Sequence, residues 1–433
     1  MQRALARLVA DGTVETRPGE GTFVRRRASS DARGDVGWQT AALGPVRGVP
    51  PIGASLRETP GDTIAMNMGY PDADLLPVHL VRSALTRAVR AVDGGPRPPV
   101  AGSPELRRWF ADELGAGPSA GGTGGWSEPD VLIAAGGQAA LTAAFRGLAA
   151  PGDRIVMESP TYWGAIGAAR QAGLTIVPVP RVDGAPSAAD LDTALATTGA
   201  RLCYVQPTFA NPTGDVWSPA QRRDILDVAV AHGAFLVEDD WAHDFAIDTD
   251  QVPPLATADT DGHVVYVRSL TKSLSPTLRV AGVLARGPAR RRIEGALVHS
   301  DLYVSPVLQT AALDVVSRAA WRTHRQRLPR LLQERRDALA DAMRTVDGIQ
   351  LRRPAGGLHL WVRLPDIGPT GAPVESADVA ARALTAGLAV SPGAEWFPAE
   401  PTGPYLRLSY AAVSTDRYRD AAQILAGSLS TAR

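Results

Sequence analysis

One cationic side chain differs in type from all the others in this chain. Of its 45 lysine and arginine residues, Lys272 in RSLTKSLSPTLRVAG (268–282) is the single lysine. Arginine keeps its charge in proteins, whereas a lysine amine can lose its proton when it is buried or lies beside other cations. The chemistry open only to the amine is nucleophilic attack on a carbonyl carbon, which ends in a Schiff base. The alternative is a surface lysine spared by chance, and the residues around Lys272 argue against it.

Apolar runs typical of buried strands alternate with helical patterns over residues 61–320. The strand-like runs are residues 131–135, 154–158, 174–179, 201–207, 234–238, 263–269 and 280–285. Helical patterns lie between several of them, such as residues 136–150, 163–173 and 219–233. This alternation predicts a mostly parallel sheet with helices on both faces, in an α/β domain.

Residues that could bind an anion or a planar ring follow several of these strands. In an open α/β sheet, ligands bind beyond the carboxyl ends of the strands. Gly136, Gly137 and Gln138 begin a helix after the first strand, where free N–H groups and the helix dipole suit a phosphate. Tyr162 follows the second strand and could lie against a planar ring. Asn211 brings an amide donor in a tight turn.

Charged residues complete this set at the strand ends. Asp239 and Asp240 follow the strand at 234–238, and Arg279 lies seven residues after Lys272. Phosphate donors, a stacking surface, a carboxylate and one amine together describe a pocket for pyridoxal phosphate. Each feature alone has an ordinary structural explanation: a turn, a solvated strand end or core packing. Their order at successive strand ends is what supports the pocket.

Three motifs make the chain resemble the fold-type I aminotransferases of class I/II. They are NPTG (211–214), EDD (238–240) and SLTKSLSPTLRVAG (269–282). The resemblance covers roughly residues 60–430, and the segment around the lysine is its most specific part. It implies a fold-type I pyridoxal-phosphate-dependent transferase, with a large domain at 61–320.

The resemblance also implies a role for each residue of the pocket. Lys272 would be the Schiff-base lysine and Asp239 the partner of the pyridine nitrogen. Asn211 would bond the phenolic oxygen of the ring, and Tyr162 would stack on it. The residues implied for the phosphate are Gly137, Gln138, Ser269, Thr271 and Arg279.

The pattern changes past about residue 320. A long amphipathic helix at 327–343 precedes alternating strands at 358–364 and 405–411, which predicts a smaller α+β domain over 321–433. The resemblance implies that Arg407 in this domain binds the α-carboxylate of a substrate. The alternative for Arg407 is a charge on an amphipathic strand.

Three positions depart from the pattern of that family. Trp241, counted with the cofactor residues, lies where the family has a tyrosine that bonds the phenolic oxygen. An indole N–H can donate but has no proton to exchange in this pH range. Arg97 replaces a tyrosine that reaches the partner subunit's phosphate, and Gly137 replaces a serine or alanine.

The first 27 residues, MQRALARLVADGTVETRPGEGTFVRRR, are basic. A helix ending at Gly12 and a β-hairpin with a glycine-rich turn are expected here. The segment resembles the second half of a GntR-type winged helix-turn-helix; the alternative is a solvated basic arm. Residues 28–60, rich in Gly, Pro, Ala and Ser, are typical of a linker. The candidates for contacts with DNA phosphates are Arg3, Arg7, Arg17, Arg25, Arg26 and Arg27.

A partial wing, a linker and an aminotransferase-like body resemble the MocR-type regulators. In that family the body senses pyridoxal phosphate or its amino-acid adduct, and the winged domains bind DNA. Half a winged helix is too small to bury a core, so we expect either a start codon upstream of Met1 or a loss of DNA binding. Two hypotheses follow: a transcription regulator that kept or lost transaminase chemistry at Lys272, and an amino-acid:2-oxo-acid aminotransferase with a vestigial wing. A lyase or decarboxylase would use the same lysine.

Composition excludes several other classes of protein. The formal net charge of zero gives no overall attraction to nucleic acid or membranes. The single cysteine, Cys203, excludes an intramolecular disulfide and is expected in the core. We found no apolar stretch suited to a signal peptide or a membrane span and no metal-binding cluster, so a cytoplasmic protein is expected. The family resemblance also implies a homodimer.

Overall fold

The computed structural model describes residues 14–17, 21–24, 38–43, 53–115, 125–249 and 253–430. Contacts within the chain divide it into two units, Met1–Val49 and Pro50–Arg433. Each unit is described by itself.

The first unit contains the predicted hairpin. Strands β1 (Val14–Arg17) and β2 (Gly21–Val24) pair antiparallel, with Val14 opposite Val24. Helix α2 (Trp38–Leu43) lies within the range predicted as a linker. The expected helix that ends at Gly12, and every arginine proposed for DNA except Arg17, fall outside the described residues. The hairpin is therefore confirmed, and the winged-helix fragment stays a prediction.

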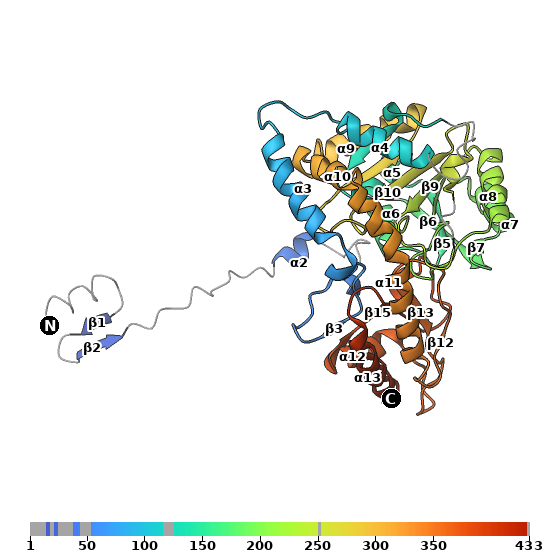
Figure 1. Cartoon of the computed structure of the whole chain (residues 1–433). Helices are drawn as coiled ribbons and strands as arrows, with labels where there is room; N and C mark the ends of the chain where they lie inside the picture. Colours follow the sequence, from blue (N-terminus) through green and yellow to red (C-terminus); the bar gives the residue numbers. More distant parts are fainter. Residues whose placement is uncertain are drawn as a thin grey trace. The chain divides into compact units, whose positions relative to one another are not determined.

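The described residues of the second unit form an eight-stranded sheet with the order β4-β11-β10-β9-β8-β5-β6-β7. Figure 1 labels β5, β6, β7, β9 and β10 of this sheet, among the helices that surround it. The five strands from β10 to β6 are parallel, while β4, β11 and β7 join antiparallel at the edges. This confirms the predicted, mostly parallel sheet. The strands are β4 (Val131–Ala134), β5 (Arg154–Ser159), β6 (Thr175–Val182), β7 (Ala185–Pro186), β8 (Leu202–Val205), β9 (Phe235–Asp240), β10 (Val264–Ser269) and β11 (Ala281–Leu284).

Helices cover both faces of this sheet, because its strands are apolar on both sides. In β10, Val264 and Tyr266 enter one buried cluster, and Val265 and Val267 enter the other. One face packs against α3 (Val78–Ala91), α4 (Pro104–Gly115), α7 (Ala188–Thr198), α8 (Pro219–Ala231) and α10 (Pro306–Val316). The other packs against α5 (Gly137–Leu148), α6 (Trp163–Gln171) and α9 (Gly287–Asp301).

A second, four-stranded sheet has the order β12-β13-β16-β15. Its strands are β12 (Gln350–Leu351), β13 (His359–Arg363), β15 (Ser391–Pro392) and β16 (Tyr405–Ser409). A third apolar cluster lies between this sheet and the helices α11 (Ala319–Met343), α12 (Ser376–Thr385) and α13 (Tyr418–Ser430). Strand β3 (Ile64–Ala65) joins the same cluster by pairing with β14 (Leu388–Ala389). The boundary at residue 320 stays a prediction.

Short 3-10 helices complete the described chain. They are η1 (Ala54–Leu56), η2 (Ala73–Leu75), η3 (Glu128–Asp130), η4 (Leu255–Thr257), η5 (Gly393–Trp396) and η6 (Thr415–Arg417). Within the described ranges, no helix has the length and apolar character to span a membrane. The same ranges hold no cluster of His, Cys, Asp and Glu suited to a metal ion. Cys203 is buried, as expected.

Candidate functional site

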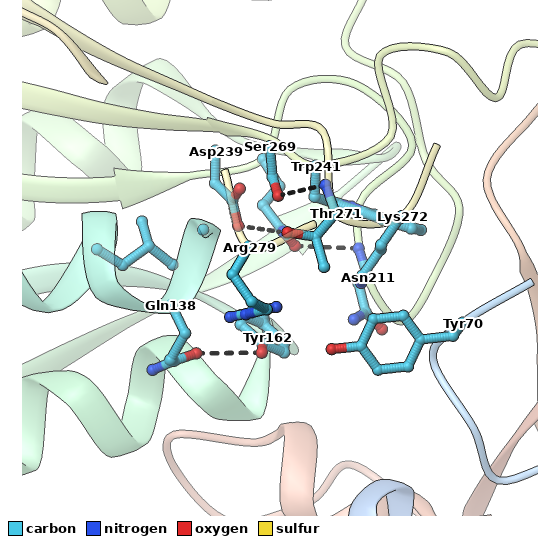
Figure 2. A pocket seen from close by; sticks show the side chains of 13 residues that line it. Tyr70, Gln138, Tyr162, Asn211, Asp239, Trp241, Ser269, Thr271, Lys272 and Arg279 are labelled. Carbon is cyan, nitrogen blue, oxygen red and sulfur yellow. Dashed lines mark hydrogen bonds between the residues drawn. The ribbon is translucent and has the colours of Figure 1, made fainter. Parts of the chain in front are cut away.

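A pocket opens at the carboxyl ends of the parallel strands, directly after β10 (Figure 2). Every residue predicted to bind the cofactor lines it. Tyr70, Leu141 and Gln206 line it as well, and none of the three was predicted. The full lining is Tyr70, Gly137, Gln138, Leu141, Tyr162, Gln206, Asn211, Asp239, Trp241, Ser269, Thr271, Lys272 and Arg279.

Lys272 lines the pocket, and its amine lies near two aromatic rings. The Nζ atom is 4.3 Å from the centroid of the Trp241 ring and 6.0 Å from that of Tyr162. Burial, and then the nearby Arg407, lower the pKa of Lys272 to about 7, although Asp239 opposes this shift. A substantial fraction of the amine is therefore unprotonated near neutral pH, which is the form that attacks a carbonyl.

The two neighbouring aspartates at the end of β9 have different surroundings. Asp239 lines the pocket, and its Oδ2 atom accepts hydrogen bonds from the Tyr204 hydroxyl (2.7 Å) and from Gln206 Nε2 (3.0 Å). Asp240 is not among the lining residues, and its Oδ2 atom accepts a bond from the Tyr266 hydroxyl (2.6 Å). The structure therefore separates the pair: only Asp239 can contact a ligand in the pocket.

Asn211 is held in one orientation by two donors. Its Oδ1 atom accepts hydrogen bonds from Trp396 Nε1 (3.1 Å) and from Arg407 Nη1 (3.2 Å). With the oxygen engaged in this way, the Nδ2 group is the end of the amide left to face the pocket. An N–H donor there suits an oxygen on a bound ring.

Arg407 is a buried cation next to the pocket. It is 1% exposed, and its Nη2 atom donates to Ser55 Oγ (3.0 Å) and to the carbonyl of Asn67 (2.9 Å). All of its hydrogen bonds among the described residues go to neutral groups. Burial lowers the pKa of Arg407 to about 9. A buried guanidinium without an anionic hydrogen-bond partner is costly, and a ligand carboxylate would supply that partner.

One end of the pocket is rich in groups that bind anions. Gly136 has a φ of 89°, and a Cβ atom built there would lie 2.6 Å from Arg279 Nη2. The backbone therefore bends closely around that guanidinium and leads into the first turn of α5, whose N–H groups face outward. Ser269 Oγ accepts the N–H of Thr271 at 3.2 Å, which keeps the serine at the same end. This arrangement suits a phosphate.

The side chain of Gln138 is engaged with protein atoms. Its Oε1 atom accepts a hydrogen bond from the Tyr162 hydroxyl (3.1 Å), and its Nε2 donates to the carbonyl of Gly164 (2.8 Å). The side chain therefore fixes Tyr162 against the pocket. What Gln138 can offer to an anion is its backbone N–H in the first turn of α5.

Trp241 does not direct its N–H into the pocket. Its Nε1 atom donates to the carbonyl of Phe209 at 3.1 Å, and its ring stacks on His359 with 5.7 Å between centroids. The indole therefore presents only its ring to Lys272. The indole N–H, which the sequence leaves as a possible donor, is engaged with a backbone carbonyl.

The donors in the pocket fit pyridoxal phosphate. Three of its features have a matching group: Lys272 for the aldehyde, Asp239 for the protonated ring nitrogen and Asn211 for the phenolic oxygen. The anion-binding end beside Arg279 matches the phosphate. Gly136 is part of this fit, because a side chain there would collide with that arginine.

Comparisons with known proteins agree with this geometry. A model of the family "Aminotransferase class I and II" matches residues 63–425. The 2-aminoadipate transaminase of Thermus thermophilus is 28% identical, over 83% of this chain and 88% of its own length. The probable rhizopine catabolism regulatory protein MocR of Rhizobium meliloti is 29% identical, over 82% of this chain and 72% of its own.

Solved structures show the same fold. The α-aminoadipate aminotransferase LysN of Thermus thermophilus, complexed with N-(5'-phosphopyridoxyl)-L-leucine, superposes with a TM-score of 0.78 at 25% identity and covers 88% of this chain and 95% of its own. This chain therefore belongs to the class I and II aminotransferases, has their fold-type I architecture, and uses pyridoxal phosphate as its cofactor.

Proposed function

We propose that the protein binds an α-amino acid beside its cofactor and exchanges the amino group with it, as in a transaminase. The observation that carries this proposal is the position of Arg407. A Cβ atom built on Gly69 would lie 4.0 Å from Lys272 Nζ and also 4.0 Å from the Nη atoms of Arg407. The amine and the buried cation thus border the same small space. A carboxylate bound by Arg407 would hold the adjacent amino carbon close to Lys272.

Each residue then has a defined task. The bound cofactor supplies an aldehyde that takes up the amino group and a ring that accepts electrons. Lys272 carries the cofactor and moves a proton at its Nζ atom, for which a pKa of about 7 is suitable. Asp239 would hold the proton on the ring nitrogen, and Asn211 would donate to the phenolic oxygen. Tyr162 covers the ring.

The phosphate would be bound at the far end of the pocket. The donors available there are backbone N–H groups of α5, the Ser269 hydroxyl and the Arg279 guanidinium. The Thr271 hydroxyl donates to the carbonyl of Leu278 at 3.3 Å. We assign this role to Gly137, Gln138, Ser269, Thr271 and Arg279, as the sequence predicted.

Replacing Arg407 tests this function. We expect Arg407→Gln to lower kcat/KM for an amino acid by roughly 10- to 150-fold, equivalent to the loss of about 1.5–3 kcal/mol from hydrogen bonds to a charged group. The measurement is the 2-oxo acid formed from a panel of amino acids with a 2-oxo-acid acceptor. Cofactor affinity, measured in parallel, should change much less, because Arg407 does not line the pocket and Trp396 Nε1 still donates to Asn211 Oδ1. An unchanged kcat/KM would show that another residue binds the carboxylate.

A second function, regulation of transcription, is favoured by two observations. The chain is similar to the MocR regulatory protein, and its first unit contains the β1–β2 hairpin. In this function the same pocket would sense the cofactor or its amino-acid adduct. We expect the full chain to bind DNA from upstream of its own coding sequence, with an affinity that changes when cofactor and amino acid are added. The absence of binding in a mobility-shift titration would exclude this function for the chain.

A further inference from the structure

The donors around Asp239 all act on one of its two oxygens. The Tyr204 hydroxyl (2.7 Å) and Gln206 Nε2 (3.0 Å) both donate to Oδ2, and neither bond involves Oδ1. Asp239 lines the pocket although it is only 4% exposed. Because Oδ2 is occupied by protein donors, Oδ1 is the oxygen that remains for a group inside the pocket.

Gln206 also connects two sides of the pocket. Its Oε1 atom accepts the backbone N–H of Asn211 at 3.0 Å, while its Nε2 donates to Asp239. A donor partner at one end and an acceptor at the other fix the orientation of this amide. The backbone N–H of Gln206 donates to the buried Glu158 Oε2 at 2.8 Å, which holds the glutamine in place.

We propose that Tyr204 and Gln206 are positioning residues that keep the Asp239 carboxylate charged and aim its Oδ1 atom at the ring nitrogen of the cofactor. This inference rests on the role of Asp239 given under the proposed function. Tyr204 acts through Asp239, since its hydroxyl donates to that carboxylate. Gln206 acts through Asp239 and also accepts the N–H of Asn211. Tyr204 is fully buried behind the pocket.

The electrostatics of the pocket agree with this role. Burial raises the pKa of Asp239 to about 6, and the hydrogen bond from Tyr204 is the largest influence that opposes this rise. The other charged or titratable groups that act on Asp239 are Lys272, which lowers its pKa, and Asp240, which raises it. The hydroxyl of Tyr162 on the opposite side also lies within electrostatic range.

The sign of the effect follows from the charge that the cofactor needs. A protonated ring nitrogen binds the carboxylate and not the carboxylic acid. The contact is therefore present above the pKa of Asp239 and is lost as the pH falls through that value. Removing a donor raises this pKa, so the contact should be lost at a higher pH.

The test measures cofactor affinity as a function of pH on the full chain without cofactor. The probe is pyridoxamine phosphate, which has no aldehyde and so reports the ring and phosphate contacts without attachment to Lys272. In Tyr204→Phe we expect the acidic limb of the plot of affinity against pH to shift to higher pH by about one unit. Within that window the affinity should fall about tenfold, as one pKa unit implies. Gln206→Leu should move the limb in the same direction.

A matched control lies on the neighbouring strand. The Tyr266 hydroxyl donates to Asp240 Oδ2 at 2.6 Å, so Tyr266→Phe removes the same kind of bond from the aspartate outside the pocket. Tyr266→Phe should lower the thermal stability about as much as Tyr204→Phe does, and it should leave the acidic limb of the affinity profile at the same pH. Equal profiles for Tyr204→Phe and Tyr266→Phe would overturn the proposal.

A second probe isolates the ring nitrogen. A deaza analogue, in which carbon replaces that nitrogen, should bind the unaltered protein and Tyr204→Phe with the same pH profile. If the analogue shows the same difference as pyridoxamine phosphate, Tyr204 acts on the fold and not through Asp239, and the inference fails. Failure of the unaltered protein to bind pyridoxamine phosphate would instead overturn the cofactor site itself.

Discussion

At the scale of single residues, two cations in and beside the pocket lie over tryptophan rings. Lys272 lies over Trp241 at 4.3 Å, and the guanidinium of Arg407 lies over Trp396 at 4.7 Å. A ring face attracts a cation without neutralising it, so both groups stay available to an anion or an aldehyde. Trp241 therefore stabilises the protonated form of Lys272. Its position in the sequence after Asp239 does not by itself reveal this role.

Replacing Trp241 should change the protonation of Lys272. In Trp241→Phe we expect a lower pKa of Lys272, because a phenyl ring stabilises a cation less than an indole does. The unprotonated amine is present above this pKa, so its reaction with pyridoxal phosphate should extend to lower pH. The shift should be less than about one pH unit, since cation–π contacts contribute about 0.5–2 kcal/mol. The rate of covalent attachment, followed by absorbance from pH 5 to 9, measures it.

Trp126 provides a matched control for that change. Its Nε1 atom donates to the carbonyl of Ala256 at 3.0 Å, and the guanidinium of Arg286 lies 4.0 Å from its ring centroid. Trp126→Phe thus removes the same type of N–H bond and weakens the same type of cation–π contact, both outside the pocket. We expect it to destabilise the protein by about 1–3 kcal/mol, as the loss of a partner for a buried carbonyl does, and to leave attachment unchanged. The same pH profile in both variants would contradict the role of Trp241.

At the scale of elements, the strands could be predicted well because their signal is local. A buried parallel strand is a continuous apolar run, and the run at 131–135 corresponds to β4 at Val131–Ala134. The start of α11 could not be predicted in the same way. The helix begins at Ala319, eight residues before the predicted start at 327. Its first turns show no amphipathic pattern, because they carry one buried apolar residue, Trp321, among arginines and other polar residues.

The candidate site was predictable only in part, and distance along the chain explains the difference. Residues that follow strands directly, such as Lys272, could be found from the order of the strands. Ser55 could not, since it reaches Arg407 from 352 positions away. Tyr204 and Gln206 carried one signal that was overlooked: they alternate along β8 and its extension. They therefore share one side of the chain, which is where Asp239 lies on the neighbouring strand.

At the scale of the whole molecule, we propose two lobes around the pocket, with residues 61–320 in the larger and 321–433 in the smaller. The cofactor would contact the larger lobe, through Lys272 and Asp239. The carboxylate of the substrate would contact the smaller one, through Arg407. The apolar cluster beneath the second sheet belongs mostly to the smaller lobe and also takes in residues of the larger one, among them Ile64, Phe209 and Phe245. The geometry of a site shared in this way depends on the relative position of the two lobes. A second subunit that contacts both lobes would help to fix that position.

We also propose that the protein is a homodimer in which Arg97 of one protomer contacts the phosphate at the other pocket. Arg97 is exposed in the single chain and does not line the pocket of its own protomer. Arg97→Ala should therefore weaken cofactor binding only through the partner subunit. Lys272→Ala should abolish covalent attachment within its own protomer.

Mixing these two variants tests the arrangement directly. In a heterodimer of one Lys272→Ala and one Arg97→Ala protomer, the pocket that keeps Lys272 would receive an intact Arg97 from its partner, because a two-fold interface exchanges equivalent residues. We expect mixed subunits to regain tight, covalent cofactor binding that neither variant shows alone, measured by reduction with borohydride and mass spectrometry at limiting cofactor. If Arg97 served its own pocket, every Lys272-containing site in the mixture would still lack it. Native mass spectrometry can show that the two variants have exchanged subunits. If such mixed dimers do not regain cofactor binding, Arg97 does not contact the partner's phosphate.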